Sequence, residues 1–265
     1  MPLKKKVTQS IPFFGAAVLI VLTCAMSAAL SAQAQTQPKP SPTPRRQLTK
    51  PVGGTRGFEM YAGRDASARL IVASSTRNIT DQAAPAYNRG QKNFEAGKYH
   101  EAVRDFAAAI KLDPKSEEAH YGLARALTKT NKLEEAIAEF KKVLDLNPTD
   151  ELKIWSYYLT GNAYAELGQY KEAIAAYQQA IKLNPELSKP HNNLGLAYAA
   201  SNRIADAASE FAEAVKLKAD YAEAHYNLGV AYWQLGKKQE AQKEQRNLAK
   251  LNPELARKLD ALIRK

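Results

Sequence analysis

The fold is decided by two related pentads, Tyr99-His100-Glu101-Ala102-Val103 and Tyr170-Lys171-Glu172-Ala173-Ile174. When the chain is aligned on these pentads, a unit of 34 residues recurs. Five units follow, at residues 83–116, 117–150, 154–187, 188–221 and 222–255. The insertion Glu151-Leu152-Lys153 precedes the third unit. This self-similarity predicts a stack of equal structural units, each packed on its neighbours.

Two apolar stripes within each unit predict two helices. Positions 4, 7, 8 and 11 follow the helical period, and so do positions 20, 24 and 27. In the fourth unit these positions hold His191, Leu194, Gly195 and Tyr198, then Ala207, Phe211 and Ala214. Small residues at positions 8 and 20 allow the two helices to approach closely. We therefore expect each unit to be a helix, a tight turn and an antiparallel helix.

The ends of the predicted helices carry residues that stop a helix. Position 15 of the five units holds Gly97, Asn131, Gly168, Asn202 and Gly236. Gly and Asn tolerate the left-handed conformation that follows a helix. Position 32 is proline in four units, which ends the second helix. After the fifth unit, Leu255, Leu259, Leu262 and Ile263 form one more stripe, which predicts a cap helix over residues 254–265.

These residues resemble the tetratricopeptide repeat family over residues 83–255. The resemblance implies an all-α, right-handed α-solenoid of five tetratricopeptide helix-turn-helix repeats plus a C-terminal cap helix. It also implies a concave groove, lined by the first helix of each pair, that binds a peptide or a partner domain. Three positions depart from the family pattern. Position 4 is never Trp, Arg89 replaces a large apolar residue at position 7, and Gln245 replaces an aromatic residue. Weakened terminal repeats are typical of a capped solenoid.

Positions 2, 5, 9 and 12 lie beside the core stripe and are expected to face the groove. They give as candidate partner-binding residues Arg125, Trp155, Tyr158, Asn162, Lys189, Asn192, Leu196, Tyr226, Val230 and Trp233. Tyr226, Val230 and Trp233 share one helical face, so they are expected to form an apolar pocket that hairpin packing does not need. Asn162 and Asn192 are expected to hold the partner's backbone. The alternative is a surface with no specific ligand.

A clamp of Lys and Asn, which some members of the family use for chaperone C-termini, is not reproduced. Tyr87 and Gln91 stand at its two positions in the first unit.

The first 34 residues are typical of a secretory signal peptide. Lys4, Lys5 and Lys6 precede the apolar stretch Ile11–Leu22, and Ala32-Gln33-Ala34 offers a cleavage site. A signal peptide cleaved after Ala34 predicts that the chain is exported to the periplasm or the cell envelope. Two alternatives remain: an uncleaved anchor over residues 11–30, and a lipoprotein modified at Cys24. The chain would touch a membrane only through this segment if it stays uncleaved.

Residues 35–56 are rich in proline and are expected to form an extended linker. Arg45, Arg46 and Lys50 could alternatively touch anionic lipid or wall polymer. Residues 57–82 have no assigned role, although residues 68–73 have the β-branched character of a short strand.

The composition excludes several classes of function. The net charge is +11, but residues 83–265 carry 27 basic and 24 acidic residues, so no nucleic acid is expected as a partner. One cysteine rules out a disulfide framework and a zinc site built from cysteines. His120, His191 and His225 lie in three separate units at position 4, so they are expected to pack rather than to bind metal.

No catalytic motif and no cofactor motif is present in the sequence. The sequence thus predicts a non-enzymatic protein-protein interaction module in the cell envelope, without metal or cofactor. The alternative function is a membrane-anchored structural spacer or assembly scaffold with no specific peptide ligand.

Overall fold

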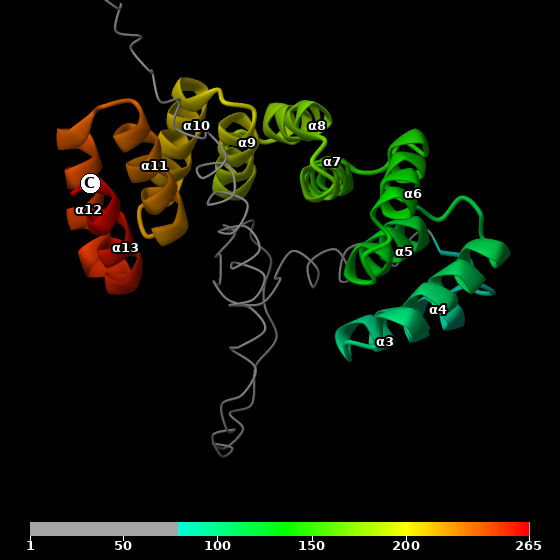
Figure 1. The fold of residues 1–265 in the computed structure, drawn as a ribbon. Helices are drawn as coiled ribbons and strands as arrows, with labels where there is room; N and C mark the ends of the chain where they lie inside the picture. The colour runs from blue at the N-terminus through cyan, green and yellow to red at the C-terminus, as the bar shows by residue number, and fades with distance from the viewer. Residues whose placement is uncertain (1–78, 265) are drawn as a thin grey trace, which may run out of the picture. The chain divides into compact units, whose positions relative to one another are not determined.

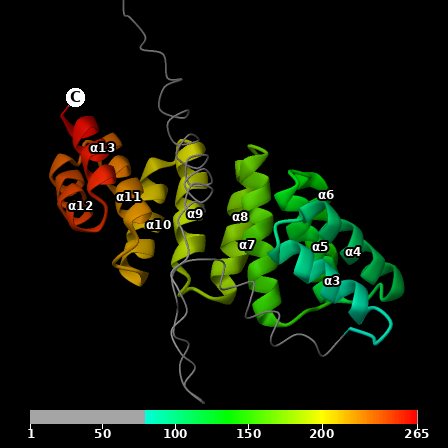
Figure 2. The ribbon, with the colours of Figure 1, turned by 90° about the horizontal axis from the view of Figure 1, so that it is seen from below.

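The computed structural model describes residues 79–264, and every regular element in this part is an α-helix. The helices follow one another in chain order in Figures 1 and 2. They are α3 (Ala84–Glu95), α4 (Tyr99–Leu112), α5 (Glu117–Lys129), α6 (Leu133–Asp145), α7 (Asp150–Glu166), α8 (Tyr170–Leu183), α9 (Ser188–Ala200), α10 (Ile204–Leu217), α11 (Ala222–Gln234), α12 (Lys238–Leu251) and α13 (Pro253–Ile263). The all-α prediction is confirmed. The predicted leader, linker and strand at residues 1–34, 35–56 and 68–73 lie outside the described residues.

The helices form five hairpins, each of which is one of the predicted units. Each second helix also contacts the first helix of the next hairpin. First helices of successive hairpins contact one another directly, from α3 with α5 to α9 with α11. Second helices in residues 79–264 have no comparable contact with one another. The first helices therefore lie on the side of the stack where successive hairpins approach most closely. We term this surface the first-helix face; it is formed by α3, α5, α7, α9 and α11.

The turn inside each hairpin has the backbone conformation that the sequence predicts. The residues at position 15 have φ values of 75°, 60°, 73°, 60° and 74°, for Gly97, Asn131, Gly168, Asn202 and Gly236. These values lie in the left-handed region, where Gly and Asn are favoured over residues with larger side chains. The prediction for position 15 is confirmed.

The second predicted stripe forms the centre of each hairpin. Phe106, Phe140, Tyr177 and Phe211 occupy position 24 and are at most 2% exposed. A Cβ atom at Gly195 would lie 2.6 Å from the ring of Phe211. Position 8 therefore requires a small residue, because the aromatic ring of the second helix lies directly against the first helix.

The insertion before the third unit adds a turn of helix. Residues 151–153 belong to α7, which has 17 residues, and the side chain of Thr149 caps its first turn. Leu152, within the insertion, is 5% exposed and packs into the core of the first two units. The insertion thus lengthens the contact between the second and third hairpins.

The cap helix α13 covers the end of the stack, as predicted. Asn252 caps its first turn, and Pro253 occupies its first position. Leu259 of α13 lies against Gly229, where the other glycine-bearing units place the aromatic ring of their second helix. This contact explains Gln245, because α13 supplies the apolar side chain that the second helix of the fifth unit lacks. None of the helices in residues 79–264 has the length and apolar character needed to cross a membrane.

Candidate functional site

A row of hydrogen-bonded asparagine side chains crosses the first-helix face. Asn227 on α11 donates from Nδ2 to Oδ1 of Asn192 on α9, over 3.0 Å. Asn192 donates to Oδ1 of Asn193 over 3.2 Å, and Asn193 donates to Oδ1 of Asn162 on α7 over 2.9 Å. These four residues are termed the asparagine ladder, and they connect the third, fourth and fifth units.

Two tyrosine hydroxyl groups hold the α7 end of the ladder. Tyr177 on α8 donates its hydroxyl proton to Oδ1 of Asn162 over 2.8 Å. The hydroxyl oxygen of Tyr158 accepts a hydrogen bond from Asn193 over 3.2 Å. The ladder is thus fixed from two neighbouring helices, which limits the rotation of its amide groups.

The two ends of the ladder keep hydrogen-bonding capacity. A primary amide has two N–H donors and an oxygen with two lone pairs. Within residues 79–264, neither Nδ2 of Asn162 nor Oδ1 of Asn227 has a hydrogen-bond partner. Both residues are partly exposed. The ladder can therefore donate one bond and accept another from a group that docks on it.

The structure thus joins two of the predicted site residues, Asn162 and Asn192, in one network. It also adds Asn193 and Asn227 at position 6, which the sequence reasoning missed. A comparison of position 6 across the units would have shown Asn in the fourth and fifth units as well as in the first.

The predicted apolar pocket is already covered by α13. Tyr226 is 7% exposed and belongs to a core cluster that includes Leu259 of α13. Val230 and Trp233 are partly buried against the same cluster. The three residues thus pack against the cap helix, a contact that the expectation about hairpin packing did not include.

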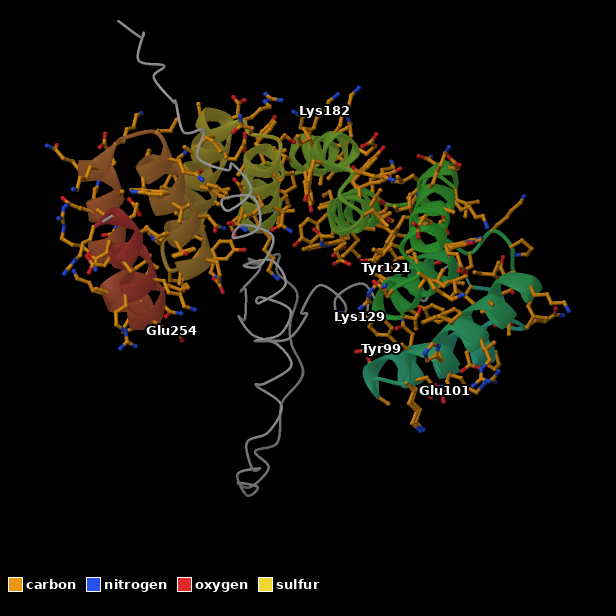
Figure 3. All side chains as sticks on the ribbon, viewed as in Figure 1. Tyr99, Glu101, Tyr121, Lys129, Lys182 and Glu254 are labelled. Atoms are coloured by element: carbon orange, nitrogen blue, oxygen red, sulfur yellow. The ribbon has the colours of Figure 1, made fainter. Side chains whose placement is uncertain are left out.

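The other predicted residues are divided between core and surface. Trp155 packs against the core of the first two units and meets the ring of Tyr158 edge-on at 5.7 Å. Leu196 is partly buried against the core of the third and fourth units, and Lys189 is exposed. Arg125 is almost fully buried on α5, and its guanidinium lies over the rings of Phe94 and Tyr121. Figure 3 labels Tyr121 and Lys129 on this helix.

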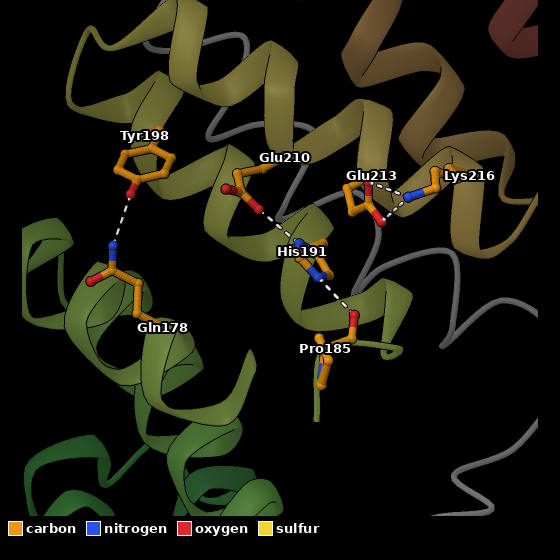
Figure 4. Close-up of polar contacts among 7 residues, drawn as sticks. All are labelled: Gln178, Pro185, His191, Tyr198, Glu210, Glu213 and Lys216. Carbon is orange, nitrogen blue, oxygen red and sulfur yellow. Dashed lines mark hydrogen bonds and ion pairs between the residues drawn. The ribbon is translucent and has the colours of Figure 1, made fainter. Parts of the chain in front are cut away.

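The buried histidines form a second set of polar contacts, this time inside the hairpins. Nδ1 of His191 lies 2.7 Å from Oε2 of Glu210, and Nε2 lies 3.0 Å from the carbonyl oxygen of Pro185 (Figure 4). Burial lowers the pKa of His191, but the hydrogen bonds to Glu210 and Pro185 outweigh burial and raise the pKa above its usual value. Only the charged imidazolium can donate to both acceptors at once.

The same arrangement recurs in the second and fifth units. His120 contacts Glu139 and the carbonyl of Pro114, and His225 contacts Glu244 and the carbonyl of Ala219. All three histidines are buried within separate hairpins. No group of three or more potential ligands in residues 79–264 is arranged to hold a metal ion.

The acidic partner at position 23 was missed by the sequence reasoning. Glu occupies position 23 in the three units that have His at position 4. The two units without this histidine have Asp105 and Ala176 there. Comparing positions 4 and 23 across the five units would have revealed the pair.

Comparison with known protein families agrees with this fold. Models described as TPR repeat match residues 161–202 and 197–236. Models described as tetratricopeptide repeat match residues 93–156 and 222–255.

Two curated proteins illustrate the similarity in sequence. Protein STIP1 homolog of Dictyostelium discoideum is 31% identical over 100 residues, which cover 37% of this chain and 17% of that protein. Mitochondrial import receptor subunit TOM70 of Rattus norvegicus is 29% identical over 118 residues, which cover 43% of this chain and 18% of that protein. The matches thus span less than a fifth of each relative.

Two solved structures share the fold. MamA from Desulfovibrio magneticus RS-1, residues 41 to the end, has a TM-score of 0.62 at 22% identity, over 66% of this chain and 98% of that one. YrrB, described as a TPR protein with an unusual peptide-binding site, has a TM-score of 0.58 at 22% identity, over 74% of this chain and 98% of that one.

Proposed function

Because the chain belongs to the tetratricopeptide repeat family, we propose that it is a protein-protein interaction module that binds an extended polypeptide of a partner on its first-helix face. The observation that carries this proposal is the asparagine ladder across α7, α9 and α11. The matches to the curated relatives cover less than a fifth of each, and YrrB is similar in fold at 22% identity. The chemistry of the partner is therefore inferred from the hydrogen-bonding groups of the ladder.

The ladder suits a polypeptide backbone for a chemical reason. A peptide group offers one N–H donor and one carbonyl acceptor, and the side-chain amide of Asn offers the same two functions. Nδ2 of Asn162 can donate to a backbone carbonyl, and Oδ1 of Asn227 can accept from a backbone N–H. Because the ladder amides already bond to one another, their geometry is set before the partner arrives, which reduces the entropy lost on binding.

We propose that binding, without catalysis, is the function of the repeats. Among residues 79–264, the titratable side chains that come closest to an acid–base pair are the three His–Glu pairs, and these lie inside the hairpins. In the fifth unit the side chains of His225 and Glu244 are only 6% and 9% exposed. A substrate docked on the first-helix face would not reach them.

The proposed setting is the cell envelope, and it is supported by the signal-like sequence of residues 1–34. Intact-mass measurement of the protein purified from its native envelope should give a chain that starts at Gln35. A mature chain that still carries Met1 or Pro2 would favour the anchor alternative.

Affinity purification from the native envelope, followed by mass spectrometry, tests the binding function. The full chain is compared with the double variant Asn162→Leu plus Asn193→Leu, which removes the polar groups of two of the four ladder residues and keeps the branched shape of their side chains. Gln242→Leu is the matched control, because Gln242 is an exposed amide on the second helix α12.

We expect a defined group of proteins to be recovered with the full chain and with Gln242→Leu, and to be lost with the double variant. Equal recovery with all three chains, in variants that melt like the parent, would rule out the ladder as the binding site.

A further inference from the structure

The guanidinium group of Arg125 is a buried charge that has no acidic partner among residues 79–264. Arg125 is 8% exposed. Its Cζ atom lies 4.3 Å from the centre of the Phe94 ring and 5.7 Å from the centre of the Tyr121 ring. Within residues 79–264, its side chain makes neither an ion pair nor a hydrogen bond. The guanidinium lies over the faces of these two aromatic rings.

The surroundings of Arg125 use their own polar groups elsewhere. The hydroxyl oxygen of Tyr87 accepts a hydrogen bond from Nε2 of Gln91 over 2.6 Å. Tyr99 packs edge-on against Phe94 at 5.3 Å, and Figure 3 labels Tyr99 on α4 and Tyr121 on α5. The walls of this cluster are therefore aromatic, and they come from α3, α4 and α5.

Glu118 is the acidic residue on α5 that could have neutralised Arg125. Its carboxylate instead accepts a hydrogen bond from Oγ of Ser116 over 3.4 Å, and no contact within 4.0 Å joins it to Arg125. Burial raises the pKa of Glu118. The positive charge on Arg125 thus has no counter-charge in direct contact in the described part of the chain.

A buried charge is costly unless a charge of opposite sign lies beside it. Contact with aromatic rings offsets part of this cost. It leaves the five N–H groups of the guanidinium without acceptors in the described residues. The planar fork of these donors matches the two oxygen atoms of a carboxylate, which binds it with two parallel hydrogen bonds. Phe94 and Tyr121 hold the fork in place before a ligand arrives.

We propose that Arg125 is the receptor for an acidic side chain, Asp or Glu, of the polypeptide bound on the first-helix face. This inference rests on the proposed function and specifies the chemistry of the partner at the α3–α5 end of that face. The asparagine ladder on α7, α9 and α11 recognises backbone groups, which all sequences share. Arg125 would therefore supply the sequence preference.

Selection from a library of random dodecapeptides displayed on phage tests this inference. The peptides are fused to the coat protein through their C-terminal ends, so the only carboxylates they offer are acidic side chains. The full chain is compared with Arg125→Met, which keeps an unbranched, flexible side chain and removes the guanidinium group with its charge. Arg104→Gln is the matched control, because its side chain is 76% exposed on α4 and its loss changes the net charge equally.

We expect peptides selected by the full chain and by Arg104→Gln to share an Asp or Glu at one aligned position. A synthetic peptide with a selected sequence should bind the full chain at least about tenfold more tightly than it binds the Arg125→Met variant. Replacing the shared Asp or Glu of this peptide with Asn or Gln should weaken binding by the same factor. Amidation of the C-terminus of the peptide should leave its affinity unchanged. If Arg125→Met does not fold, Arg125→Lys is measured instead, and it should also bind more weakly because it lacks the fork.

Selected peptides without a shared acid, or an acid preference that persists in Arg125→Met, would overturn the inference and leave the proposed function intact. An acid preference lost equally in Arg104→Gln would also overturn it, because that result reflects net charge alone. Failure of the full chain to select any peptide would refute peptide binding and this inference together.

Discussion

His191 and Glu210 join the two helices of the fourth unit through a contact of 2.7 Å between Nδ1 and Oε2. The other ring nitrogen of His191 reaches back to Pro185, which belongs to the end of the third unit. One side chain therefore connects three segments: the preceding turn, the first helix and the second helix. The second and fifth units repeat this arrangement, so three of the five units carry the same histidine contact.

The raised pKa of His191 predicts a stability contribution that depends on pH. Because the folded state holds the proton more tightly than the unfolded chain, the contribution is fully present below the unfolded pKa of 6.5. It is lost as the pH rises through the folded pKa. Glu213, which pairs with Lys216, also favours the charged ring.

Thermal unfolding of the full chain and of Glu210→Gln should show this dependence. We expect the variant to be less stable at pH 6, by about 1–3 kcal/mol, because the hydrogen bond to a charged group is weakened. The gap between the two melting temperatures should narrow as the pH rises to 9. A gap that is constant or that widens with pH would show that His191 is neutral in the folded protein.

The contact between Gly195 and Phe211 predicts an energetic coupling between these positions. Gly195→Ala would place a methyl group against the ring of Phe211, and overpacking of this kind costs about 1–3 kcal/mol. The loss should be smaller in the background of Phe211→Leu, where the smaller side chain leaves room. Urea unfolding of the four chains of this cycle should give a coupling of at least about 1 kcal/mol. Additive effects would contradict the close packing.

The fold could be predicted almost completely from the sequence because its signals are local and repeated. The turn at position 15 depends on the residue itself, and Gly or Asn occurs there in every unit. The insertion at residues 151–153 could also be recognised in the sequence, but the structure that it adopts could not be predicted. Whether three residues form a loop or an extra turn depends on Leu152 finding space in the core of the preceding units.

The candidate site was predictable only in part, because its contacts join different units. Helical periodicity places Tyr226, Val230 and Trp233 on one face, but it does not say what covers that face. The structure shows that α13 does. Periodicity likewise identifies Asn162 and Asn192 as individual candidates. It does not predict their hydrogen bonds, because these depend on the offset between neighbouring first helices.

The position of α13 changes the expected effect of substitutions at the end of the stack. Leu259→Ala should lower the free energy of unfolding by about 2–5 kcal/mol, because Leu259 is fully buried. Trp233→Ala should also destabilise the protein, by at least about 1 kcal/mol, because its ring packs against the same cluster.

Leu251→Ala is the control for these two variants, because Leu251 is 40% exposed, and it should cost less than about 1 kcal/mol. Urea unfolding measures all three. A Trp233→Ala variant with unchanged stability would restore the interpretation of Trp233 as a surface residue that binds a partner.

Site-specific photo-crosslinking tests the central claim, that the partner lies on the first-helix face. A photoreactive phenylalanine analogue is placed at Lys189, which is exposed on α9, or at Ser209, which is exposed on the second helix α10. Each chain is irradiated in the native envelope, and crosslinked proteins are identified by mass spectrometry. We predict a specific crosslinked partner from position 189 and none from position 209. A partner crosslinked from position 209 alone, or equally from both positions, would contradict the claim.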